Sequence, residues 1–166
     1  MGEKTILILG VGNLLLSDEG VGVHLVRRLM EMDVPPEAEI VDGGTGGYEL
    51  IEFFRHKKKI IIVDCLKGDA PPGSIIRASP DQLDLCWGPS FSPHQYGLRE
   101  LLHHAASLTP PPEITILGVV PEDTESPGMN LSKTLEAIIG RLVAEVFELV
   151  SSDRQGRIPE LPFRRK

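Results

Sequence analysis

The side chains best suited to chemistry in this sequence are four carboxylates and one imidazole, placed close to the ends of predicted strands or helices. Asp18 and Glu19 lie in the glycine-rich stretch "GVGNLLLSDEGVG", Asp42 and Asp64 each end an apolar run, and His94 stands in "SPHQYG". Two carboxylate oxygens and one ring nitrogen make an incomplete site for a divalent transition metal such as nickel or zinc, with positions left for a substrate. Acids at such positions also cap helices, so spacing alone leaves both interpretations open.

The glycine-rich stretch does not predict a nucleotide site. Gly10 and Gly12 fit the dinucleotide fingerprint, but Leu15 occupies the third glycine position, and no Gly-Lys-Ser/Thr follows. Asp18 and Glu19 would also stand where a pyrophosphate binds, and like charges repel. We therefore reject a nucleotide cofactor.

Strand and helix patterns alternate along the chain, and they define where these polar residues lie. Apolar and β-branched runs predict strands at 5–9, 39–42, 59–65, 73–79 and 113–120. Amphipathic patterns predict helices at 21–30, 50–54, 98–105 and 132–150, the last with Ser132 as its N-cap. This order predicts a three-layer α/β sandwich: a twisted, largely parallel or mixed five-stranded sheet with helices on both faces. Ligands of such sheets bind beyond the carboxyl ends of the strands, where the four acids converge.

Length and charge restrict the class of protein further. The chain has 166 residues and a net charge of −7, which fits one domain over 1–150 and disfavours nucleic acid as a partner. Residues 151–166 carry five basic and two acidic residues, a net +3, and we expect a mobile basic tail. No apolar run approaches the length of a membrane span and no signal peptide is recognised, so we expect a cytoplasmic protein with no membrane insertion.

The two cysteines do not indicate a disulfide framework or a zinc site, because Cys65 and Cys86 lack CxxC spacing. Cys65 adjoins Asp64, but strand alternation directs its side chain to the opposite face of the sheet. We expect a small buried hydrophobic side chain there.

With these residues identified, the sequence resembles the hydrogenase maturation endopeptidases, which trim the large-subunit precursor of nickel-iron hydrogenases. The resemblance covers the chain to about Val150 through "LGVGNLLLSDEGVGVHLV", "VDGGTGGYELI", "IIIVDC", "SPHQYGL" and "LGVVPE". It implies the sandwich fold predicted above. It also implies that Glu19, Asp64 and His94 contact nickel that is already installed in the client, before a short C-terminal peptide is removed.

The same resemblance makes the hydrogenase large-subunit precursor the expected partner and the supplier of the nickel, although zinc or cadmium could also occupy the site. It places Gly43, Gly44 and Thr45 of "DGGTGG" near the cleft, where they are expected to hold substrate backbone. Neither H-E-x-x-H nor a Ser or Cys nucleophile motif is present, so Asp18 or Asp42 is the expected assisting acid. The alternative function is a non-catalytic metal-binding protein or hydrogenase assembly chaperone on the same scaffold. The sequence does not indicate the oligomeric state.

Overall fold

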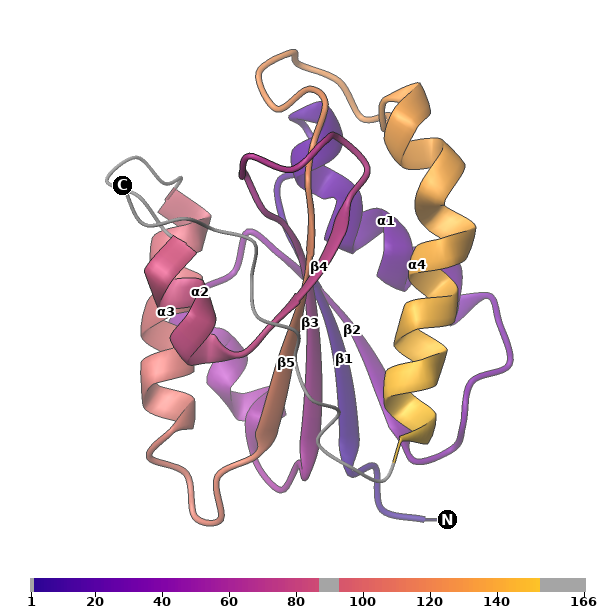
Figure 1. The fold of residues 1–166 in the computed structure, drawn as a ribbon. Helices are drawn as coiled ribbons and strands as arrows, with labels where there is room; N and C mark the ends of the chain where they lie inside the picture. Colours follow the sequence, from indigo (N-terminus) through magenta and orange to yellow (C-terminus); the bar gives the residue numbers. More distant parts are fainter. Residues whose placement is uncertain (1, 87–92, 153–166) are drawn as a thin grey trace.

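A computed structural model describes residues 2–86 and 93–152, with the backbone alone described for residues 84–86, 93 and 94. Figure 1 shows the arrangement of its helices and strands. The strands are β1 (Ile6–Val11), β2 (Ala38–Gly44), β3 (Lys59–Cys65), β4 (Ile75–Ala78) and β5 (Glu113–Val119). The helices are α1 (Val21–Met30), α2 (Pro80–Cys86), α3 (Pro93–Ala105) and α4 (Lys133–Ser151), with 3-10 turns η1 (Ser17–Gly20) and η2 (Tyr48–Phe54).

The five strands form one mixed sheet, as predicted, and their order is β2-β1-β3-β5-β4. Four of them are parallel, and only the edge strand β4 runs antiparallel, beside β5. The carboxyl ends of β1, β2, β3 and β5 therefore meet at one edge of the sheet, called here the C-terminal edge. Most of the candidate site residues follow these strand ends.

Helices cover both faces of the sheet, which confirms the three-layer sandwich (Figure 1). On one face α1 and α4 pack against Ile61, Val63 and Cys65 of β3. On the other face η2, α2 and α3 pack against Ile60 and Ile62. This alternation follows from the period of two along a strand, and it places Cys65 and its neighbour Asp64 on opposite faces, as predicted.

Helix α4 confirms one predicted terminus and extends the other. Ser132 is the N-cap, and its side chain accepts a hydrogen bond from the backbone N–H of Leu135 at 3.3 Å. The helix continues through Ser151, one residue past the predicted end. Lys59 of β3 donates from Nζ to the carbonyls of Leu149 and Ser152, which satisfies acceptors that the end of a helix leaves free. The first residues of the expected tail, Ser151 and Ser152, thus belong to the end of α4 and its C-cap, and residues 153–166 lie outside the described part.

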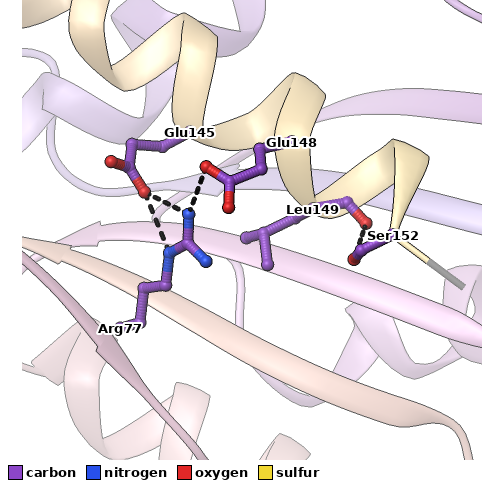
Figure 2. A network of polar contacts seen from close by, with 5 residues as sticks. All are labelled: Arg77, Glu145, Glu148, Leu149 and Ser152. Carbon is purple, nitrogen blue, oxygen red and sulfur yellow. Dashed lines mark hydrogen bonds and ion pairs between the residues drawn. The ribbon is translucent and has the colours of Figure 1, made fainter. Parts of the chain in front are cut away.

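Polar contacts also attach α4 to the antiparallel edge strand. Arg77 of β4 donates from Nε to Glu145 at 2.9 Å and from one terminal nitrogen to Glu148 at 3.0 Å (Figure 2). These side chains join the edge strand to the helix that covers it. Within the described residues, no helix is long and apolar enough to cross a membrane.

Candidate functional site

The glycine-rich stretch after β1 serves close packing of the backbone. A Cβ atom added to Gly22 would lie 2.1 Å from the carbonyl oxygen of Val63, and one added to Gly12 would lie 1.9 Å from that of Glu19. Gly12 also has a φ of +138°, which side-chain-bearing residues rarely adopt. These contacts let η1 and α1 sit directly against the ends of β1 and β3. The glycines thus bring the Asp18–Glu19 pair to the C-terminal edge.

Glu19 and Asp64 lie at this edge as two buried carboxylates. Glu19 is 8% exposed and Asp64 is 4% exposed, and one oxygen of Asp64 accepts the backbone N–H of Cys65 at 2.7 Å. Burial raises the pKa of the Cys65 thiol well above its ordinary value, and the charges of Asp64, Glu19 and Asp18 raise this pKa further. The η1 turn that carries Asp18 and Glu19 packs beside β3. The structure thus brings Asp64 to the same edge of the sheet as the Asp18–Glu19 pair, from which it is distant in sequence.

Asp18 has a different environment from its neighbour Glu19. Its side chain is completely buried, and it accepts three backbone hydrogen bonds, from Glu122 and Asp123 at 2.9 Å each and from Ser132 at 2.7 Å. These donors belong to the loop between β5 and α4 and to the N-cap of α4. The contacts make Asp18 an anchor between η1 and that loop. Its predicted catalytic role stays a prediction, and its oxygens are already engaged.

Asp42 faces a different layer of the sandwich. It lies close to the end of β2 beside Gly10 of β1, and its carboxylate pairs with Nε of Arg27 from α1 at 3.0 Å. It also accepts the backbone N–H of Gly44, the last residue of the strand, at 3.1 Å. The side chain of Asp42 therefore lies on the face of the sheet covered by α1, whereas that of Asp64 lies on the face covered by α3. The two acids share the edge of the sheet without sharing a face.

The loop after β2 packs against α3. Gly44 has a φ of +51°, and its carbonyl accepts the N–H of Gly12 at 2.8 Å. Gly47 approaches Gly97 of α3 so closely that a Cβ on Gly97 would lie 3.0 Å from the Gly47 Cα. This glycine pair was not singled out from the sequence, although both residues belong to quoted motifs. Gly43 and Gly44 end β2 and exposed Thr45 follows them, and the predicted contact of these residues with substrate backbone stays a prediction.

His94 lies in the first turn of α3, but its side chain is outside the described part of the structure. Helix α3 packs on the sheet face toward which Asp64 points, so the backbone of His94 belongs to the same layer. Among the residues with described side chains, no cluster of three His, Cys, Asp or Glu residues could hold a metal ion. The described side chains of the candidate site are therefore the buried carboxylates of Glu19 and Asp64, and metal binding by these residues and by His94 stays a prediction.

This arrangement suits an ion that another molecule also ligates. Two carboxylates fill at most part of the coordination shell of a divalent ion, and a closed structural site would need about four protein ligands. Burial of Glu19 also favours a positive partner, because buried charges are paired or coordinate metals. The chemistry of the donor set is thus compatible with nickel presented by a client.

The comparisons with known proteins agree with this geometry. The family model described as hydrogenase maturation protease matches residues 23–149. The hydrogenase 2 maturation protease of Escherichia coli strain K12 is 36% identical over 159 residues, which cover 93% of this chain and 95% of that protein.

Solved structures support the same relationship. The hydrogenase maturating endopeptidase HybD from Escherichia coli superposes with a TM-score of 0.78 at 34% identity, over 87% of this chain and 91% of that one. A hydrogenase 2 maturation peptidase from Thaumarchaeota archaeon SCGC_AB-539-E09 gives a TM-score of 0.66 at 30% identity, over 88% and 97% of the two chains. The sandwich fold and these relatives together place the chain among the maturation peptidases. The chain belongs to the hydrogenase maturation protease family, and it is therefore a hydrolase of the endopeptidase class.

Proposed function

We propose that this protein removes a short C-terminal peptide from the nickel-loaded large-subunit precursor of a nickel-iron hydrogenase. Membership of the protease family supports the class of reaction, and the name of the E. coli relative supports hydrogenase as the client. The observation that supports the nickel requirement is the burial of two carboxylates, Glu19 and Asp64, at the C-terminal edge of the sheet. His94, in the layer of α3, completes the proposed set as a nitrogen ligand.

In this mechanism the nickel ion arrives as part of the substrate. Glu19, Asp64 and His94 then occupy the coordination positions of the ion that the client leaves open. Recognition of nickel and positioning of the scissile bond are then coupled, because both depend on the same contact. An acid close to the bond would accept a proton from the attacking water. Asp42 is better supported than Asp18 for that step, because its side chain is 28% exposed and its partner Arg27 lies on the surface.

The decisive experiment mixes the purified protein with nickel-loaded and nickel-free precursors and weighs the products by mass spectrometry. We expect loss of the C-terminal peptide from the nickel-loaded form alone. Equal cleavage of the nickel-free form would contradict nickel recognition. Binding of the precursor without any release of peptide would favour the alternative of a non-catalytic assembly chaperone.

Variants of the proposed ligands sharpen this test. Asp64→Asn keeps the shape of the side chain but supplies a neutral, poorer ligand, so cleavage should be lost while the circular dichroism spectrum is retained. His94→Ala should weaken binding of added nickel in calorimetric titrations and remove most of its decline at acidic pH, because imidazole binds metal only when neutral. Asp33→Asn is the matched control, since Asp33 is an exposed acid in the loop between α1 and β2.

A further inference from the structure

The loop between β5 and α4 and the segment around η1 form one continuous surface next to the candidate site. Leu16 and Gly128 form a parallel β-bridge, and the backbone N–H of Ser17 donates to the carbonyl of Gly128 at 2.8 Å. The N–H of Gly128 in turn donates to the carbonyl of Leu15 at 2.9 Å. Together with the three bonds to Asp18, these contacts fasten the two segments to each other, so their exposed side chains form a preformed surface.

Two large apolar side chains stand on this surface without burial. Leu15 is 63% exposed and Met129 is 56% exposed, and each adjoins a residue of the Leu16–Gly128 bridge. We call this surface the Leu15–Met129 face. Scattered exposed apolar residues are ordinary, but two on adjoining, hydrogen-bonded segments beside a functional site indicate an interaction surface.

The Leu15–Met129 face continues directly into the candidate site. The backbone N–H of Glu19 donates to the carbonyl of Leu16 at 3.1 Å, so one 3-10 turn connects exposed Leu15 with the buried carboxylate. Figure 1 shows the β5–α4 loop at the end of the sheet where α4 begins, above the carboxyl ends of the parallel strands. A polypeptide lying on this face would therefore extend toward Glu19 and Asp64.

The charged residues of the β5–α4 loop are of one sign, and Lys133 begins α4 directly after the loop. Residues 121–132 include Glu122, Asp123 and Glu125 and contain no lysine, arginine or histidine. Glu122 and Glu125 are exposed. An acidic rim around an apolar centre selects a partner whose apolar side chain is flanked by Lys or Arg, since complementary charges speed association and exclude wrong partners.

We propose that the Leu15–Met129 face is the docking surface for the hydrogenase precursor, and that it takes an apolar segment flanked by basic residues close to the peptide that is removed. This proposal rests on the proposed function. A client seated here covers both apolar side chains and brings its C-terminal region to the carboxylate pair. The face then determines affinity for the client, and the carboxylates determine whether the bound client is cut.

The test compares cleavage kinetics of nickel-loaded precursor by the wild type, by Leu15→Ser/Met129→Ser and by Met30→Ser/Met32→Ser. Met30 and Met32 are exposed at the far end of α1, so their double variant is the matched control. We expect the Leu15/Met129 variant to raise KM about tenfold with kcat nearly unchanged, because a docking contact acts on binding rather than on the chemical step. The control variant should keep the wild-type KM. Glu122→Gln/Glu125→Gln should slow association and reduce its dependence on salt.

The outcomes distinguish failure of the docking proposal from failure of the proposed protease function. Cleavage by the wild type with an unchanged KM in the Leu15/Met129 variant would overturn the docking surface and leave the protease function intact. An equal rise of KM in both double variants would also overturn it, because the effect would not be specific to this face. Failure of the wild type to cleave any nickel-loaded precursor would overturn the proposed function itself. Melting curves of all variants establish that the altered KM belongs to folded protein.

Discussion

The buried carboxylate of Asp18 offers the clearest test of how the candidate site is held in place. In Asp18→Asn the amide keeps one acceptor oxygen, and its best orientation accepts from Glu122 and Asp123, which share one oxygen in the wild type. The amide nitrogen then faces the N–H of Ser132, donor against donor. An unsatisfied buried donor costs about 1–3 kcal/mol, and loss of charge assistance in the other two bonds adds roughly 0.5 kcal/mol each. We therefore expect Asp18→Asn to lower the free energy of unfolding by about 2–4 kcal/mol.

Urea denaturation followed by circular dichroism measures this loss. Small domains have about 5–15 kcal/mol of stability, so the variant should still fold at low denaturant concentration. Ser17→Ala is the matched control, because Ser17 Oγ donates to the carbonyl of Ser126 at 2.8 Å across the same two segments. Its loss should stay below about 1 kcal/mol, since the bond is exposed and neutral. An Asp18→Asn variant within about 0.5 kcal/mol of the wild type would refute the anchoring role.

Three further predictions follow from the surroundings of Cys65 and Arg77. In a Cys86→Ser background, native Cys65 should resist thiol reagents at neutral and mildly alkaline pH, because burial and neighbouring carboxylates raise the pKa of its thiol; rapid labelling without unfolding would contradict this. Because the pKa of this thiol is higher in the folded protein, its contribution to the free energy of unfolding is fully present below the ordinary thiol pKa of 9.0. This contribution should be lost as pH rises above 9.0, and urea denaturation at several pH values measures the loss. Arg77→Met should lower the free energy of unfolding by about 1–2 kcal/mol, because Glu145 loses its cation; an unchanged urea midpoint would count against the contact.

The strand pattern of this fold could be predicted because each central strand is a continuous apolar run buried on both sides. Strand β3 illustrates this, since Ile60, Ile61 and Ile62 alternate between the two cores. The antiparallel direction of β4 was not specified, because a short run such as "IIRA" reads the same in either direction. Helix α2 was missed because a seven-residue segment beginning with proline has too few turns to show a helical period.

The candidate site was predictable to the extent that it depends on strand ends. Glu19 follows β1 and Asp64 lies at the end of β3, and neighbouring parallel strands place such residues at one edge of the sheet. The different orientation of Asp42 was not predictable, because "EIVD" does not reveal which way its pleat faces. The three donors to Asp18 lie 104, 105 and 114 residues away along the chain, so no local pattern could show them.

That separation has a consequence for the order of events when the protein is made. The ribosome delivers Asp18 early, while its partners in the β5–α4 loop and at the start of α4 emerge only after most of the sheet has been synthesised. Contacts between such distant residues form after the intervening chain has closed its loops. The turn that carries Glu19 is therefore fastened among the last parts of the fold. In a nascent chain, the first strands would therefore exist before the C-terminal edge of the sheet is complete. The candidate site would form only when the whole domain has folded.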